Sequence, residues 1–426
     1  MAGVRLGIAA ASGTYGARYT FPVPPPVERK SGYLPGLDGL RALAILGVLM
    51  AHDLPWTIAG HSNEKWKGYG GWGVQLFFAL SGVLICWRLL EDEAKLGHIN
   101  LKDFYIRRLF RIQPAALAYL GVVALLFVAG AIPYDWHLWW SAVLSYANFL
   151  ITVATPPGAA AFLGHFWTLA VEEHFYILIS LLFLVARRRR TALLVCLLAA
   201  LLIGQKFAES RGQFSTITSI RRTYWVIQFL LFPALLALLV RRPKIRDFAA
   251  RYASPGVAAL AILLAMWLNI ALGGVHLLMH EVRHFSPLFL VSYNINLVFY
   301  GYALIVIAVM LHPRSLTTRF LELKPMRFVG RLSYSIYLWH IPFFIPVFLP
   351  DQIHSKLMLT LAGRPWKYLA TAAVALLSYF LIEKPLIRYG HKLAPPATAG
   401  HRDLSALPAQ RNTPQTQTPA TAEFSG

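Results

Sequence analysis

Apolar residues along this chain form long runs that short polar segments interrupt. Runs of about 17 to 25 residues are long enough to cross a hydrocarbon core of about 30 Å as a helix. The runs cover residues 37–53, 72–90, 114–131, 136–153, 165–186, 191–205, 224–241, 255–273, 287–311, 331–350 and 366–388. The pattern therefore predicts an all-α, polytopic integral membrane protein.

The basic residues of the loops indicate how many of these eleven runs cross the membrane. Cytoplasmic loops carry an excess of Lys and Arg, so an arginine-rich loop is expected inside. With a cytoplasmic N-terminus and eleven spans, the arginines at 187–190 would face outward. If 136–153 does not cross, the basic segments 187–190, 241–246, 314–331 and 388–392 all lie inside. The sequence therefore predicts about ten transmembrane helices, with both termini cytoplasmic.

The exceptional run, 136–153, is also the most aromatic and the most polar of the set. It contains Trp136, Trp139, Trp140 and Asn148. Non-helical backbone is tolerated at membrane depth where protein or a cavity covers it. We therefore expect this run to form a re-entrant or interfacial segment.

A separate helix is expected just before the third run, at residues 98–113. Leu101 and Phe104 fall on one helical face, whereas Arg108 and Arg111 fall on another. A helix with one apolar and one basic face typically lies in the plane of the membrane interface. The segment is thus predicted to be an interfacial helix, distinct from the span that follows it.

Composition supports a membrane protein. It argues against a nucleic-acid-binding protein and against a fold held by disulfides or by a cysteine-bound metal. Of the 426 residues, 57% are hydrophobic and 14% are charged, whereas soluble domains carry about 25% charged residues. The formal net charge is +21, but no basic domain stands outside the apolar runs, so no nucleic-acid partner is expected. Cys86 and Cys196 both lie inside apolar runs. We expect no disulfide and no metal site from so few cysteines.

The two ends of the chain differ from the rest in composition. Residues 1–31 are rich in Ala and Gly and then in Pro, without the continuous apolar segment of a secretory signal. Residues 393–426 are rich in Pro, Thr, Gln and Ala. Both are expected to be disordered cytoplasmic tails, which flank a membrane domain at 32–392.

Ionisable residues inside membrane runs are costly and therefore mark functional sites. Arg41 and His52 lie in the first run, eleven residues or about three helical turns apart, so they share a face. Histidine readily takes and returns a proton near neutral pH. The alternative is an interfacial histidine that only forms a hydrogen bond at the helix end.

Two further pairs have helical spacing. Arg108 and Arg111, at i and i+3, can grip phosphate groups at the cytoplasmic surface, although anchoring to anionic lipid would explain them too. Glu172 and Tyr176, at i and i+4, share one face where another run begins. A carboxylate is expensive there unless it lies in the wet interface, which is the alternative.

A polar stripe near the end of the chain is the last candidate. Ser333, Tyr337 and His340 recur at i, i+4 and i+7, although a packing stripe with hydrogen-bonded hydroxyls has the same pattern. The chain has no G-x-S-x-G nucleophile motif and no Gly-rich phosphate loop of the Walker type. Ser81, beside Gly82, is expected to serve helix packing.

Six short motifs follow one another along the chain. They are Leu37-Asp38-Gly39-Leu40-Arg41-Ala42 with His52, then 77–82, 107–114, 167–176, 337–342 and Glu383-Lys384-Pro385. Each motif is weak alone, but together and in this order they resemble the acyltransferase family 3 membrane proteins over about residues 33–389.

Members of that family move an acyl group, often acetyl, from cytoplasmic acyl-CoA to a hydroxyl acceptor. By position, His52 would be the catalytic base, Arg41 would orient the donor or the histidine, and Glu172 would be a further essential polar group. Arg108 and Arg111 would bind the CoA phosphates. The remaining polar residues of these segments would line the site: Asp38, Tyr176, Ser333, Tyr337 and His340.

The resemblance also implies partners and a location. No cofactor would be permanently bound, since acyl-CoA (acetyl-CoA) acts as a co-substrate. The acceptor would be a hydroxyl-bearing glycan, a lipid-linked sugar or a small molecule, beside envelope-polysaccharide machinery in the inner (plasma) membrane. The chain departs from the family at Ser180, where Pro is frequent. Some members carry a further hydrolase-like domain; none is seen here, so transfer is expected to finish within the membrane domain.

Two other classes compete with an enzyme. A multi-span transporter of sugars or acylated substrates would also place polar residues among many helices. Such transporters typically show internal repeats and helix pairs broken by Gly or Pro, and neither is evident in this sequence. A non-catalytic scaffold would leave the costly polar residues unexplained. The sequence therefore favours a membrane O-acyltransferase.

Overall fold

Helices form almost all of the fold. The computed structural model describes residues 33–53, 57–58, 61–62, 72–150, 157–211, 222–264 and 295–395. The tails expected at 1–31 and 393–426 lie outside these residues, except for residues 393–395. The described helices belong to a unit that begins at Leu34. This unit also contains one short antiparallel hairpin, formed by β1 (Thr57–Ile58) and β2 (His61–Ser62).

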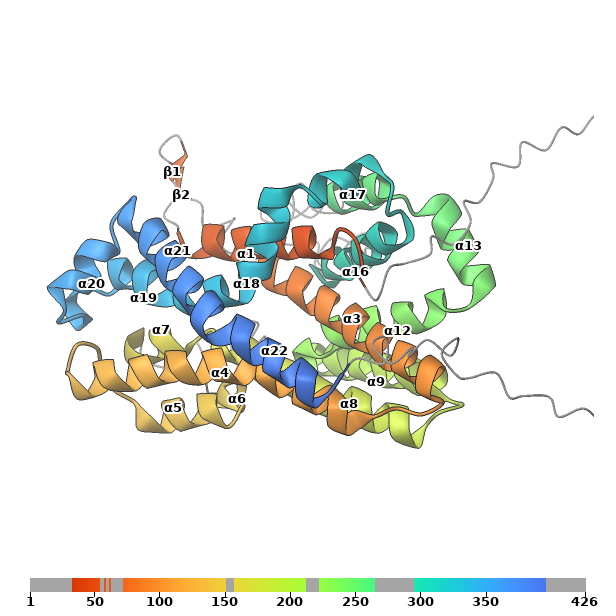
Figure 1. The fold of residues 1–426 in the computed structure, drawn as a ribbon, viewed down its shortest axis with the longest axis horizontal. Coiled ribbons are helices and arrows are strands. Elements are labelled where there is room, and N and C mark those ends of the chain that lie inside the picture. Colours follow the sequence, from red (N-terminus) through yellow and green to blue (C-terminus); the bar gives the residue numbers. More distant parts are fainter. Residues whose placement is uncertain are drawn as a thin grey trace, which may run out of the picture. The chain divides into compact units, whose positions relative to one another are not determined.

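The helices follow one another in the order shown in Figure 1. They are α1 (Leu37–His52), α3 (Trp72–Leu96), α4 (Leu101–Val128), α5 (Trp136–Val143), α6 (Ala147–Leu150), α7 (Pro157–Leu163), α8 (Phe166–Val185), α9 (Arg190–Ser210), α11 (Thr223–Val226), α12 (Gln228–Val240), α13 (Pro243–Tyr252), α16 (Ile295–Leu311), α17 (Leu316–Leu321), α18 (Lys324–Trp339), α19 (Ile341–Phe344), α20 (Lys356–Leu361), α21 (Trp366–Ser378) and α22 (Lys384–Leu393). A π-helical turn, η4 (Tyr379–Glu383), joins α21 to α22, and two 3₁₀ turns, η2 (Pro346–Phe348) and η3 (Pro350–Gln352), follow α19.

Several helices are long and apolar enough to cross a membrane. In the described part of the chain, five qualify singly: Trp72–Leu96, Leu101–Val128, Phe166–Val185, Thr223–Val240 and Trp366–Leu393. A pair bent by 71°, Pro243–Tyr252 and Pro255–Leu264, adds a sixth if it forms one broken span. The described residues thus support an all-helical membrane protein, whereas the predicted number of about ten spans is not confirmed.

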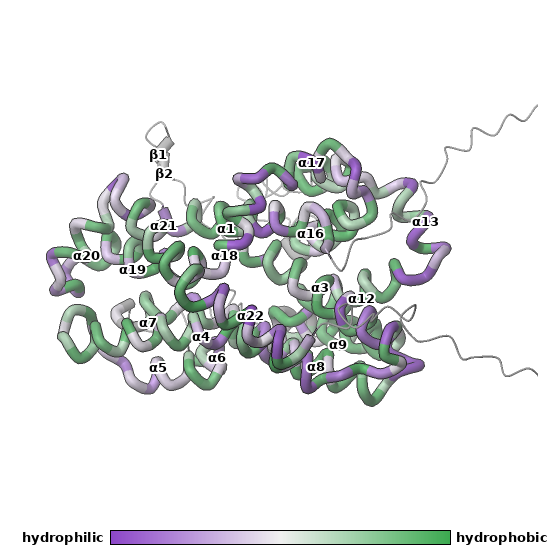
Figure 2. Tube along the Cα trace, in the orientation of Figure 1, coloured by the Kyte–Doolittle hydropathy of each residue, from purple (hydrophilic) through white to green (hydrophobic). Residues whose placement is uncertain are grey.

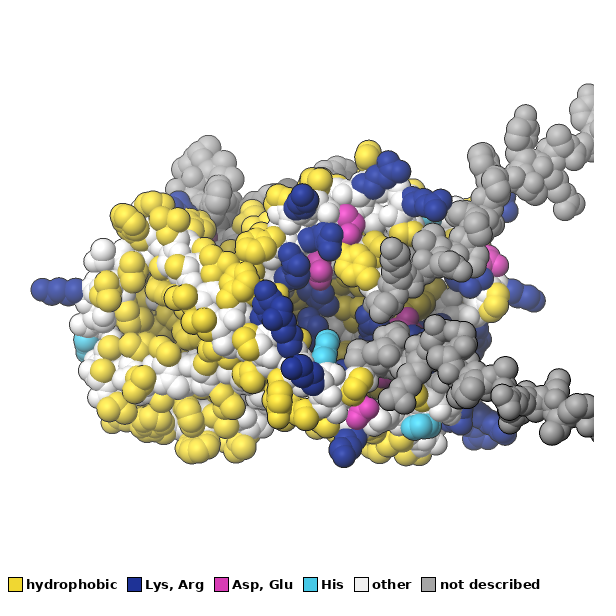
Figure 3. Space-filling model, viewed as in Figure 1, with side chains coloured by type: hydrophobic (Ala, Val, Ile, Leu, Met, Phe, Trp, Pro, Cys, Tyr) yellow, Lys and Arg dark blue, Asp and Glu magenta, His cyan; other side chains and the backbone are white. Residues whose placement is uncertain are grey.

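Exposed apolar side chains cover the outside of these candidate spans. Leu125, Val128 and Val185 are 69%, 78% and 79% exposed. Soluble proteins rarely expose large contiguous apolar patches. Figure 2 shows hydrophobic positions along α4 and α8 and polar positions on α13, and Figure 3 shows apolar side chains over the region of α4, α5 and α21. This surface suits contact with lipid.

The aromatic run at 136–153 does not form a single spanning helix. Its described part consists of α5 and α6, which are 8 and 4 residues long. They are separated at Ser145, which has a φ of 59°, a conformation that interrupts a right-handed helix. Residues 151–153 lie outside the described part. The predicted re-entrant path of this run stays a prediction.

The separate interfacial helix predicted at 98–113 is wrong. Residues 101–128 form one continuous helix, α4, whose N-terminus is capped by the Asn100 side chain. Pro114 lies inside this helix without ending it, because the buried face continues in helical register. That face carries Phe104, Ile112, Ala115, Tyr119 and Val123. Packing of this face outweighs the hydrogen bond that Pro114 removes.

The closest helix contact in the site region joins α1 to α18. A Cβ atom on Gly330 of α18 would overlap the backbone carbonyl oxygen of Asp38 on α1. A Cβ atom on Gly39 would likewise overlap the backbone of Leu321 in α17. Small residues allow helix backbones to approach in this way. As a result, α1 lies directly against α17 and α18.

Replacing Gly330 with Ala is expected to destabilise the protein by about 3 kcal/mol, because the new methyl group must displace a backbone that has no space to move. Thermal unfolding of the purified protein in detergent measures the effect. Gly121→Ala is the matched control, since no atom lies within 4 Å of a Cβ there. Equal midpoints for the two variants would contradict the proposed contact.

Candidate active site

The first polar cluster surrounds Glu172, in the second turn of α8. Its carboxylate accepts hydrogen bonds from Ser81 Oγ on α3 at 3.1 Å, from an Arg108 guanidinium nitrogen on α4 at 3.1 Å, and from the Tyr176 hydroxyl. The Arg108 guanidinium also lies 3.8 Å from the centre of the Tyr176 ring. The predicted pairing of Glu172 with Tyr176 on one face is therefore present. Ser81, which we expected only to serve packing, is one of the donors.

Two more arginines join this cluster. Arg41 donates to Asp38 on its own helix at 2.7 Å, and Arg111 interacts electrostatically with Arg41, Arg108 and Asp38. Arg111 is exposed, and it forms no ion pair with a carboxylate of the described residues. We call Arg41, Arg108, Arg111 and Glu172 the arginine cluster. Its three guanidinium groups lie beside the carboxylates of Asp38 and Glu172, and the exposed Arg111 is open to an anion.

Glu383 borders the arginine cluster from the other end of the chain. It is 3% exposed at the end of the π-helical turn η4 and accepts hydrogen bonds from Ser335 and, at 3.3 Å, from Ser378. It also interacts electrostatically with Arg111. Single π turns are frequent at functional sites. The sequence marks this residue only as an acid in the last apolar run, within the motif Glu383-Lys384-Pro385.

A second polar cluster lies at the other end of α1. The ring of His52 is 4.9 Å from that of His340, which in turn is 6.1 Å from that of His165. His340 and His165 are 0% and 5% exposed. We call these three residues the histidine cluster. The sequence predicted His52 and His340 but missed His165, which precedes α8 and carries no spacing signal.

Hydrogen bonds determine the tautomer of two of these rings, those of His52 and His340. Nδ1 of His52 lies 3.0 Å from the carbonyl oxygen of Val48, and Nδ1 of His340 lies 2.7 Å from that of Tyr337. A carbonyl oxygen can only accept, so Nδ1 carries the proton in both rings. In the neutral rings Nε2 is therefore the basic nitrogen, as a general base requires.

The predicted stripe on α18 is only partly connected to the histidines. The Tyr337 hydroxyl lies 2.6 Å from Thr168 Oγ1 and donates to the carbonyl oxygen of His165 at 3.1 Å. Ser333 is buried one turn earlier without a hydrogen bond to the other site residues. The stripe therefore holds the segment around His165 through Tyr337.

A buried ion network fixes the end of α1 directly after His52. Asp53 is 3% exposed and receives the Arg364 guanidinium at 2.9 Å, the Lys367 ammonium and the Tyr368 hydroxyl. Its partners come from the start of α21 and the turn before it. Sequence reasoning missed this network, because Lys367 lies inside an apolar run and is far from Asp53 along the chain.

Arg41 and His52 lie on one helix, as the sequence predicted, but they belong to different clusters. Arg41 and His52 are eleven residues apart on α1, or about 16 Å at about 1.5 Å per residue. Arg41 belongs to the arginine cluster, whereas His52 contacts His340. Among the described residues, no three His, Cys, Asp or Glu side chains are arranged to hold a metal ion.

Comparison with known proteins identifies the class of this chain. It belongs to acyltransferase family 3, since a family model described as an acyltransferase domain matches residues 34–384. This confirms the resemblance drawn from the motifs. The O-acetyltransferase OatA of Staphylococcus aureus is 29% identical over 84% of this chain and 58% of its own length. A putative O-acetyltransferase of Staphylococcus aureus strain COL is 28% identical over 73% and 51%.

The chain thus spans a little over half the length of the curated relatives it matches. No solved structure matches it.

The Asp53 network generates a stability prediction. Asp53→Asn leaves the buried Lys367 ammonium without its counter-charge and is expected to cost about 3 kcal/mol. Thermal unfolding in detergent measures this loss. Asp247→Asn is the control, since Asp247 is 55% exposed in its ion pair with Arg246 and should change little. A small, equal effect for both variants would show that the network does not stabilise α1.

Proposed function

We propose that this protein is a membrane O-acyltransferase that moves an acyl group, expected to be acetyl, from acyl-CoA to a hydroxyl acceptor. Membership of the family and the names of the relatives support this reaction class. The acceptor is expected to be a hydroxyl-bearing glycan, a lipid-linked sugar or a small molecule. The charge of the loops favours a cytoplasmic position for both termini, and the resemblance to the family implies the inner (plasma) membrane.

The observation that carries the proposal is the spacing of the two clusters along α1. The arginine cluster suits phosphate groups, and the histidine cluster suits proton transfer. Between phosphate and thioester, CoA has a pantetheine arm about as long as four to five extended residues, or roughly 15 Å at about 3.4 Å per residue. This matches the separation of about 16 Å between Arg41 and His52.

The donor would bind through its phosphates at the arginine cluster. Arg111 is exposed, and Nε of Arg108 is buried without a hydrogen-bond partner in the described part of the chain. Glu172 holds Arg108 in place on its other side. Guanidinium groups form strong, charge-assisted hydrogen bonds with phosphate. Asp38, through Arg41, would complete this side of the site.

At the other end, Nε2 of His52 would accept the proton of the acceptor hydroxyl. The oxygen attacks the thioester carbonyl, the carbon–sulfur bond breaks, and the imidazolium returns its proton to the leaving thiolate. General-base catalysis of this kind contributes about 10²–10⁴-fold. His340 packs edge-on against His52 and would set the orientation of its ring, and Tyr337 would hold the opposite wall.

A transporter of sugars or acylated substrates is the second candidate. Family membership and the spacing of a phosphate-binding cluster from a base favour transfer chemistry instead. Product that forms from acyl-CoA without any ion gradient would distinguish the two.

His52→Gln is expected to lower kcat at least 100-fold, because the base is lost while the fold remains. Transfer of radiolabel from acetyl-CoA to the lipid and glycan fraction of native membranes measures it. The exposed His98 offers the matched control His98→Gln, which should keep full activity. Undiminished transfer by His52→Gln would remove the histidine from the mechanism.

Arg111→Gln should act on donor binding. Loss of a charge-assisted contact with phosphate is expected to raise KM for acetyl-CoA about tenfold, with a smaller effect on kcat. Initial rates at varied acetyl-CoA concentration separate the two constants. Arg188→Gln, at another exposed arginine, is the control. A fall in kcat alone would place Arg111 outside the donor site.

A further inference from the structure

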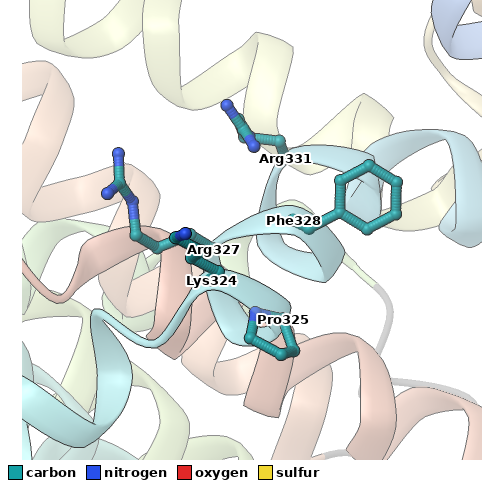
Figure 4. Close-up of a pocket in the computed structure, with 5 residues that line it drawn as sticks. All are labelled: Lys324, Pro325, Arg327, Phe328 and Arg331. Atoms are coloured by element: carbon teal, nitrogen blue, oxygen red, sulfur yellow. The ribbon is translucent and has the colours of Figure 1, made fainter.

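A pocket opens on the first two turns of α18, outside both clusters described above. It has a volume of about 460 Å³ and is lined by Lys324, Pro325, Arg327, Phe328 and Arg331. Four of these residues, at i, i+3, i+4 and i+7, share one face of the helix. Figure 4 shows the guanidinium groups of Arg327 and Arg331 extending from the same side of α18. The pocket thus combines three cations with one aromatic ring.

Two of the three cations of this pocket have no acidic partner among the described residues. Lys324 and Arg331 are exposed, and neither forms an ion pair with any carboxylate that the structure describes. Arg327 forms an ion pair with Glu322, with 3.8 Å between its Nε and the carboxylate. Figure 3 shows Lys and Arg side chains gathered in a band across the middle of one face. An anionic ligand is therefore the natural occupant.

The pocket adjoins the arginine cluster. Arg331 lies one turn before Tyr334, whose hydroxyl donates to the carbonyl oxygen of Ile112 at 2.8 Å. Ile112 directly follows Arg111 on α4. One extended phosphate-bearing ligand can therefore contact the pocket and Arg111 together.

Helix α18 also runs from the pocket to His340, which contacts the proposed base, His52. Arg327 and His340 are thirteen residues apart, or about 20 Å along the helix, and His340 contacts His52. In CoA the 3′-phosphoadenosine, the diphosphate and the pantetheine arm follow one another in a line. The order of pocket, arginine cluster and histidine cluster along α18 and α1 is the same.

We propose that this pocket binds the 3′-phosphoadenosine end of CoA. Phe328 stacks on the adenine, as aromatic side chains do with bases, and Lys324 and Arg327 hold the 3′-phosphate. Arg331 shares the diphosphate with Arg111. This assignment rests on the proposed acyl-CoA-dependent function, and it identifies the part of the donor that the pocket recognises.

The phosphate of an anionic lipid headgroup has the same charge chemistry. A concave pocket with an aromatic ring favours the nucleotide, because a headgroup needs cations but no stacking surface. The test must therefore separate a soluble nucleotide from lipid.

The test uses the full chain in lipid nanodiscs and adenosine 3′,5′-bisphosphate as the probe. In the double variant Lys324→Ala/Arg331→Ala, the Kd of this probe is expected to rise at least tenfold, as is KM for acetyl-CoA. The effect on S-acetylpantetheine, which lacks the nucleotide, should be much smaller. Phe328→Leu should weaken the probe several-fold with all charges kept. Arg246→Ala, at an exposed arginine on α13, is the control.

Three results would overturn the assignment. One is unchanged affinity for adenosine 3′,5′-bisphosphate in both variants. Another is an equal loss with acetyl-CoA and S-acetylpantetheine, which would show general damage to the site. The third is a defect that appears only in nanodiscs with anionic lipid, which would assign the pocket to a headgroup.

The probe binding needs no turnover, so the two proposals can fail separately. Nucleotide binding that depends on Lys324 and Arg331, in a protein that transfers no acyl group, would keep the pocket and remove the proposed function. If the protein transfers acyl groups from acetyl-CoA but its affinity for the probe does not depend on Lys324 and Arg331, the proposed function stands and the pocket assignment is wrong.

Discussion

The contact of α1 with α18 is the constraint on which the rest of the site depends. Gly330 lies against the backbone of Asp38, so the two helices run side by side at a distance that no larger residue allows. Polar groups lie at both ends of the segment over which the two helices pack. The arginine cluster begins near Asp38, and the histidine cluster forms where His52 meets His340. A shift of either helix would change both clusters together.

Buried charge in this protein is compensated by partners from distant parts of the chain. Glu172 on α8 takes donors from α3 and α4, and Asp53 after α1 takes donors from the start of α21. An unpaired charge in a membrane interior would be costly. These pairs therefore hold the helices in one arrangement. In the arginine cluster, Arg111 is exposed and forms no ion pair with a described carboxylate, so it is available for a ligand.

The three polar regions follow one another along two packed helices. The basic pocket at the start of α18, the arginine cluster and the histidine cluster follow one another, with α18 and α1 as the common supports. Each region suits one part of a CoA thioester: a charged nucleotide, a diphosphate and a reactive carbonyl. The apolar side chains exposed on α4 and α8, such as Leu125 and Val185, would face the lipid around these regions.

Much of this protein follows from its sequence alone, because the deciding interactions are local. Apolar runs and basic loops identified a helical membrane protein, ordered motifs identified the family, and helical spacing placed Glu172 beside Tyr176. Tertiary structure alone decided the long-range pairs. It carried α4 through Pro114 because a buried face continued, it placed Arg41 with Arg111 and His52 with His340, and it brought Lys367 to Asp53. Spacing predicts neighbours on one helix, whereas helix packing determines which faces of different helices meet.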